Sequence, residues 1–207
     1  MKGSAVPIFR GQGKVIYFAH VPKCAGSSAE DYLRRFGCVA MLDRKYKAGR
    51  GRNWTQSSPQ HMLAKDLERL FPADFFDAGF AIVRAPKARL RSAFHYHRDH
   101  EKRIPAGETF ANFVQQIEGF DDRRHRSFDH HFLPQNAFVP DWCRVFRLED
   151  GTAALEDWLA GLLDLPATAP FPQELRGSYK AAADDDQQTD DLIRRIYNAD
   201  YERFGYS

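Results

Sequence analysis

The chain has 207 residues, of which 43% are hydrophobic and 28% are charged, a composition typical of a globular protein with one well-buried core. With 30 Lys and Arg against 28 Asp and Glu, the formal charge is only +2, which argues against a dedicated nucleic-acid binder or a membrane-surface protein. Any anion site must therefore be local, and we expect a single domain over residues 1–207.

The sequence also shows no membrane segment, no signal peptide and no metal-binding cysteine pattern. No uninterrupted apolar run approaches the roughly 20 residues needed to span a bilayer, and residues 1–10 lack the apolar region of a signal peptide. Cys24, Cys38 and Cys143 show neither a paired framework nor a metal-ligand spacing. These features predict a cytoplasmic protein without a membrane segment and without a metal.

The first quarter of the chain predicts a strand, a tight loop and a helix. The β-branched and aromatic run at 14–20 is typical of a buried strand, and we take it as the first strand. The stretch 27–36 has apolar residues at helical spacing and ends at Gly37. Residues 38–42 then suggest a short strand, followed by a polar loop at 43–58.

The strand, loop and helix pattern recurs further along the chain. Ser58 before Pro59 has the pattern of an N-cap and a first helical position, so we expect a helix there that ends at 71–72. A second clear strand at 80–84 leads to a helix at 87–99, which begins after Pro86.

Residues 144–148 predict a third strand, 152–163 a helix and 191–204 one closing amphipathic helix. Strands that alternate with helices predict an α/β fold with three layers, in which helices cover both faces of a central parallel sheet.

The loop Pro22-Lys23-Cys24-Ala25-Gly26-Ser27-Ser28 lies where a strand gives way to a helix. Free backbone N–H groups and the helix dipole meet at such a point and favour an anion. Gly26 allows close backbone approach, Ser27 and Ser28 add hydroxyl donors, and Lys23 adds a positive charge. The loop is not a Walker A loop, because its lysine precedes the glycine. A plain turn with a surface lysine is the alternative.

A second phosphate site is suggested by Arg84 at the end of a strand and Ser92 two turns into the next helix. A guanidinium and a hydroxyl together suit a terminal phosphate dianion. We interpret Arg89 and Arg91, on the same helix, as solvated charges. A surface arginine at a strand end is the alternative for Arg84.

Taken together, these segments resemble one enzyme family. PKCAGSS and VRAPKARLRSAF are similar to the two nucleotide loops of sulfotransferases that use 3′-phosphoadenosine 5′-phosphosulfate (PAPS), in the family that contains the carbohydrate sulfotransferases. HHFLPQ, RVFRLED and IYNADYERFGYS resemble later motifs of that family, so the likeness extends from Val15 to Tyr206. The resemblance implies a fold like that of the P-loop NTPases, PAPS as donor and 3′,5′-adenosine bisphosphate (PAP) as product.

The resemblance also implies roles for single residues. Those that would hold the 5′-phosphosulfate are Lys23, Gly26, Ser27 and Ser28, with the backbone of Cys24 and Ala25. Arg84 and Ser92 would hold the 3′-phosphate, and a late loop with Arg176, Ser178 and Lys180 would close over the nucleotide. Two positions depart from the family pattern, since Ala85 replaces a usual Asp that would cap the helix and orient Arg84, and Cys24 replaces a common Thr.

Sulfuryl transfer needs positioning, charge stabilisation and a base for the acceptor hydroxyl. Lys23 is the candidate that stabilises the departing oxygen. His61 is the first candidate base, because the first turn of a helix favours neutral imidazole, and its position resembles the catalytic histidine of the uronyl 2-O-sulfotransferase branch. His131 is the rival base. A surface role for His61 and a packing role for His131 are the alternatives, and His95, His97, His100 and His125 are interpreted as solvated.

The acceptor is expected to be a hydroxyl on a saccharide or a small alcohol. Basic and aromatic residues at 44–54 suit the grip on a sugar, although a solvated loop is the favoured interpretation. Glu149 and Asp150 are interpreted as a strand end and a helix cap. The alternatives to a sulfotransferase are a non-catalytic module that binds anionic glycans or nucleotides, and a small-molecule nucleotide kinase; the near-neutral charge disfavours nucleic acid.

Overall fold

The computed structural model describes residues 7–40, 57–165, 171 and 186–207. Within these residues, five strands form one sheet in the order β3–β1–β2–β4–β5. The strands are β1 (Ile8–Gly11), β2 (Lys14–Ala19), β3 (Cys38–Ala40), β4 (Ala78–Val83) and β5 (Arg144–Arg147). The pairs β2–β4 and β4–β5 are parallel, whereas β1 is antiparallel to both of its neighbours. The sheet is therefore largely parallel, with one reversed strand.

The reversed strand β1 precedes the run that we took as the first strand. Gly11 pairs with Lys14, so a turn of two residues joins β1 to β2. Gln12 and Gly13, which form the turn, have φ of 48° and 72°, as tight hairpins require. β1 lies between β3 and β2, and it has only four residues with one fully buried side chain, Phe9, so it carries little periodic signal.

Eight α-helices are found in the described residues: α1 (Gly26–Leu33), α2 (Ala64–Leu70), α3 (Pro86–His95), α4 (Phe110–Ile117), α5 (Asp122–Ser127), α6 (Ala153–Leu163), α7 (Gln187–Ile196) and α8 (Asn198–Phe204). A π-helical turn, Tyr96–His100, extends α3. Single 3₁₀ turns occupy Pro59–His61, Ala73–Phe75, Gln135–Ala137 and Leu148–Asp150. None of the helices in these residues is long and apolar enough to cross a membrane.

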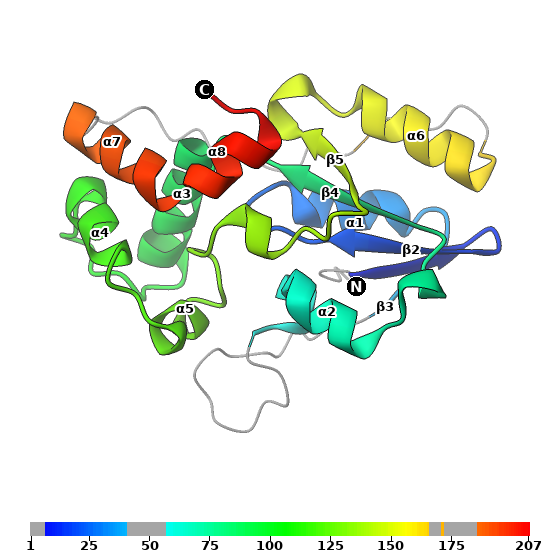
Figure 1. Ribbon diagram of the computed structural model, residues 1–207, viewed down its shortest axis with the longest axis horizontal. Helices are drawn as coiled ribbons and strands as arrows, with labels where there is room; N and C mark the ends of the chain where they lie inside the picture. Colours follow the sequence, from blue (N-terminus) through cyan, green and yellow to red (C-terminus); the bar gives the residue numbers. More distant parts are fainter. Residues whose placement is uncertain (1–6, 41–56, 166–170, 172–185) are drawn as a thin grey trace.

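Helices cover both faces of the sheet, as the alternating pattern predicts (Figure 1). On one face, Trp158 of α6 packs against Phe80 of β4 and Phe146 of β5. On the other, Tyr17 of β2 contacts Phe76 and Trp142, outside the strands. The protein is therefore a mixed α/β fold with a central sheet between helical layers.

A second apolar cluster lies beside the sheet, where α3, α4 and α7 gather (Figure 1). Phe94, Phe113 and Ile193 are buried in it, one from each of these helices. The single closing helix expected at 191–204 is in fact α7 and α8, because the helical path breaks at Tyr197, whose hydroxyl donates to the carbonyl of Phe132 (2.8 Å). Buried Tyr197 thus fixes the C-terminal helices onto the segment that carries the histidine-rich motif.

Candidate active site

The loop between β2 and α1 points backbone donors at one spot. Lys23 and Ala25 both have left-handed φ, 68° and 59°, and alternation of such residues with helical ones is the geometry of an anion-binding nest. The first N–H bonded inside the helix is that of Ala29, to the carbonyl of Ala25. Within the described residues, the N–H groups of Gly26, Ser27 and Ser28 have no protein acceptor, so they remain available to an anion.

Gly26 is required at its position by a neighbouring ring. A Cβ atom there would lie 1.5 Å from Nε2 of His20, so any side chain would displace the imidazole. His20 is buried, and burial lowers its pKa well below the usual value, so the ring is neutral. The loop and the end of β2 are therefore packed together as one rigid unit at the start of α1.

Gln135 ties this loop to the second one. Its side-chain oxygen accepts the N–H of Arg84 (2.9 Å) and the thiol of Cys24 (3.3 Å), and its amide nitrogen donates to the carbonyl of Arg84 (2.8 Å). The carboxylate of Asp200 in turn accepts the N–H of Gln135 (2.8 Å). The two loops that the sequence singles out are thus held side by side at the ends of β2 and β4.

The two cations of these loops are close enough to repel each other. Burial, together with the charge of Arg84, lowers the pKa of Lys23 to about 8. Its ammonium lies 4.1 Å from the ring centre of Tyr96. In the part of the chain that the structure describes, neither Lys23 nor Arg84 has a carboxylate within ion-pair distance. Two unneutralised cations beside unpaired N–H groups suit a phosphorylated nucleotide, so the residues present fit PAPS.

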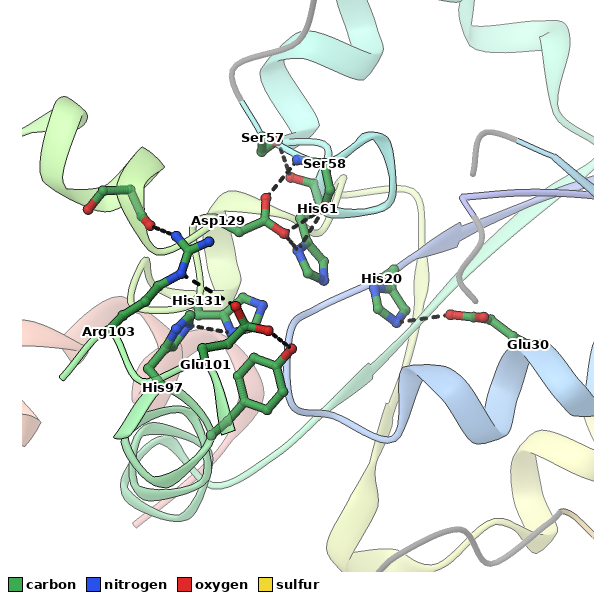
Figure 2. A network of polar contacts seen from close by, with 12 residues as sticks. His20, Glu30, Ser57, Ser58, His61, His97, Glu101, Arg103, Asp129 and His131 are labelled. Carbon is green, nitrogen blue, oxygen red and sulfur yellow. Dashed lines mark hydrogen bonds and ion pairs between the residues drawn. The ribbon is translucent and has the colours of Figure 1, made fainter. Parts of the chain in front are cut away.

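His61 and Asp129 form a hydrogen-bonded pair near the loop between β2 and α1 (Figure 2). Nδ1 of His61 lies 2.8 Å from Oδ2 of Asp129. The carboxylate also accepts the backbone N–H (2.6 Å) and the hydroxyl (2.7 Å) of Ser58. Burial works to raise the pKa of Asp129, but His61 and the bonds from Ser58 bring it below the usual value. Asp129 is therefore a carboxylate that orients the imidazole.

The position of His61 corrects one prediction. Pro59–His61 is a single 3₁₀ turn, Leu63 is extended, and the helix begins only at Ala64. His61 therefore lies before α2 and not in its first turn, so the predicted effect of a helix dipole on this residue is wrong. Ser58 does not cap a helix, because its hydroxyl and N–H are engaged by Asp129. A carboxylate that is remote in sequence orients His61 instead.

The other histidines of the site stack around His61. Its ring lies parallel to that of His20, with centres 5.1 Å apart, and edge-on to that of His131, at 4.9 Å. Nδ1 of His131 lies 2.9 Å from Nε2 of His97. Burial, with nearby His61, lowers the pKa of His131 well below the usual value, so this ring is neutral too. Figure 2 shows the rings of His20, His97 and His131 converging from the residue after β2, the π-helical turn and the segment after α5.

Two side chains that we interpreted as solvated, those of Arg89 and His97, are in fact buried. Arg89 is fully buried and donates to the carbonyls of His131 (3.0 Å) and Leu133 (2.5 Å). His97 is 2% exposed, not solvated.

Asp150 does not cap α6 but pairs with Arg147 (2.9 Å), while Glu149 accepts the N–H of Ala85 (2.8 Å) and the hydroxyl of Tyr206 (3.0 Å). Glu149 therefore supplies an acceptor to the N–H of the residue that departs from the family pattern.

Of the remaining predicted site residues, the structure describes Ser92. Ser92 is half-buried on α3. Arg176, Ser178, Lys180 and the basic loop at 44–54 lie outside the described residues. Asp129 was not predicted, because its partner lies 68 positions away. Its place beside the histidine pair at 130–131 is the local signal that could have indicated it.

The free N–H groups at the start of α1, the neighbouring cations Lys23 and Arg84 and the oriented His61 suit a transferase that acts on a nucleotide-activated group. A family model described as "Sulfotransferase family" matches residues 7–207. The chain belongs to this family and is a sulfotransferase, and the family implies PAPS as co-substrate. No curated protein and no solved structure matched the chain.

Proposed function

We propose that this protein moves a sulfuryl group from PAPS to a hydroxyl of a carbohydrate or small alcohol by in-line displacement, in the manner of the uronyl 2-O-sulfotransferase branch. One observation carries the nucleotide half of the proposal. Lys23 and Arg84 hold two repelling, partly buried cations next to the free N–H groups at the start of α1. Bound anions would relieve this repulsion and satisfy the donors.

The donor nucleotide supplies the activated sulfuryl group, and the loops hold its two ends. Residues 23–28 bind the 5′-phosphosulfate through their N–H groups and the hydroxyls of Ser27 and Ser28. Arg84 and Ser92 bind the 3′-phosphate. The ammonium of Lys23 stabilises negative charge on the oxygen that departs, which is the main electrostatic contribution expected in transfer of this kind.

His61 is the proposed base that takes the proton of the acceptor hydroxyl. Its contact with Asp129 (2.8 Å) places a proton on Nδ1 and leaves Nε2 free to accept another. The carboxylate also stabilises the charge that the ring acquires. His131 lacks such a partner, since its Nδ1 faces the neutral ring of His97. This difference favours His61 over His131, and a positioned base contributes roughly 10²- to 10⁴-fold in rate.

Calorimetry with PAP tests the nucleotide site. Wild type should bind PAP, and Lys23→Ala and Arg84→Ala should each weaken binding by about tenfold or more, since each removes a charge-assisted contact. Lys65→Ala is the matched control, because Lys65 is an exposed lysine on α2. Undiminished binding in both loop variants would eliminate the site.

Transfer of radiolabel from PAPS to a panel of sugars, lipids and phenols tests the reaction and identifies the acceptor. His61→Ala should lose transfer by about 10²-fold or more while it keeps PAP binding. Turnover retained in His61→Ala but lost in His131→Ala would assign the base to His131. PAP binding without transfer to any acceptor would indicate the non-catalytic module.

A further inference from the structure

His61, Asp129 and His131 are the group of metal-ligand side chains that the described part of the chain brings together. Each offers one ligand atom, and these atoms lie within 4.8 Å of one another. His61 and His131 are 7% and 6% exposed, and the side chain of Asp129 is 17% exposed. Two imidazoles and a carboxylate therefore face one small space that is largely screened from water.

Contacts from outside the group already orient two of these ligands (Figure 2). Nδ1 of His131 lies 2.9 Å from the ring of His97. The carboxylate of Asp129 accepts the N–H and the hydroxyl of Ser58 (2.6 and 2.7 Å). In zinc sites, ligating histidines and carboxylates have such outer partners, which fix their orientation and strengthen metal binding.

We propose that His61, Asp129 and His131 bind one Zn²⁺ ion. Two histidines and a carboxylate with a fourth, open position are a ligand set that zinc adopts in proteins. Ligand atoms on a tetrahedral zinc with bonds of about 2.0–2.1 Å lie about 3.3 Å apart. From a spread of up to 4.8 Å, the three side chains need to close by about 1.5 Å at most. The ion replaces the proton held between His61 and Asp129, so binding releases that proton.

The ion would act as an inhibitor. Zinc on His61 and Asp129 removes the pair that accepts the acceptor proton, so occupancy should stop transfer. This consequence rests on the proposed function of His61, whereas metal binding itself does not. A spectroscopic test of binding therefore stays separate from any test of activity.

Cobalt(II) is the probe, because it takes zinc sites and its visible absorption reports tetrahedral coordination. Tag-free protein, freed of metal with EDTA, should bind one equivalent of Co²⁺ with intense visible bands, and added Zn²⁺ should abolish them. Asp129→Ala and His131→Ala should each lose the bands. His100→Ala, which removes an exposed histidine, should keep them.

Either of two results would overturn the site: no tetrahedral spectrum in wild type, or the same spectrum in Asp129→Ala and His131→Ala. A thiolate-to-cobalt band would also overturn it, because it would place a cysteine on the ion. Circular dichroism shows whether each variant is folded. If Asp129→Ala is unfolded, Asp129→Asn keeps the side-chain shape and an oxygen for Ser58 but removes the anionic ligand, and it should bind Co²⁺ at least tenfold more weakly.

Discussion

Burial in the fold disfavours the positive charge of Lys23, whereas a bound anion would favour it. Its folded pKa is about 8 against 10.5 for an unperturbed lysine, because of burial and then Arg84. The protonated side chain therefore destabilises the free protein below pH 8, and this cost disappears as the pH rises from about 8 to 10.5. A nucleotide at the site favours the protonated form and so depends on the charge that the fold disfavours.

PAP affinity should therefore fall as the pH rises through the pKa of Lys23. From a free-protein pKa of about 8, the loss between pH 7 and pH 9 is about tenfold if the complex keeps the proton. Calorimetry across that range measures it. Lys23→Arg, which stays charged, should remove the decline; a decline that persists in Lys23→Arg would assign it to another group.

Arg89 is a buried guanidinium that stabilises the segment carrying His131. Arg89→Met keeps much of the volume but leaves the carbonyls of His131 and Leu133 without their donor. We expect a loss of about 3 kcal/mol in the free energy of unfolding, measured by urea denaturation. Arg123→Met, on exposed α5, is the control and should change it by less than about 0.5 kcal/mol. Equal midpoints for the two variants would contradict the role of Arg89.

At the scale of elements, the junction between β2 and α1 is the part most sensitive to added volume. Gly26→Ala places a methyl group against His20, at 1.5 Å from Nε2 before relaxation. The ring must move, and with it the start of the helix. We expect a destabilisation of about 1–3 kcal/mol and a loss of PAP affinity of about tenfold, by thermal denaturation and calorimetry.

Gly161→Ala is the matched control, because Gly161 lies within α6 and an added Cβ there meets no atom within 4 Å. This change should stabilise the protein by about 0.5–1 kcal/mol. If Gly26→Ala behaved in the same way, the close approach of His20 would not constrain the loop.

At the scale of the whole molecule, the C-terminal helix α8 supports both nucleotide loops. Asp200 is fully buried and accepts the N–H groups of Gln135 and Asn136, at 2.8 Å each. Gln135 then bonds to Cys24 in the first loop and to the backbone of Arg84 in the second. The last helix of the chain thus positions residues from the first half.

Asp200→Asn tests whether the contacts of Asp200 with Gln135 and Asn136 stabilise the two loops. The two N–H groups of Gln135 and Asn136 each bond one oxygen of Asp200, whereas an asparagine side chain has only one oxygen. About 2 kcal/mol of stability should therefore be lost, and PAP should bind more weakly. Asp157→Asn, an exposed change on α6, is the control. Full stability and PAP affinity in Asp200→Asn would show that Gln135 holds the loops without α8.

Much of the layered fold follows from local pattern. The runs at 14–20, 80–84 and 144–148 correspond to β2, β4 and β5, and the helix that follows each of them begins within one residue of the expected position. Apolar runs bounded by Gly and Pro determine such elements locally. The strand β1 was not predicted, because it depends on the two-residue turn that pairs it with β2. The break between α7 and α8 was not predicted either, because it depends on the burial of Tyr197.

The sequence by itself determined the anion loop, the arginine that follows β4 and the candidate histidines, because each depends on residue type within a few positions. Only the tertiary structure decided that Asp129 orients His61, that Gln135 joins the loops and that Arg89 and His97 are buried. These contacts join residues 34 to 111 positions apart. No local pattern encodes them, because hydrogen bonds depend on separation in space, which chain packing alone sets.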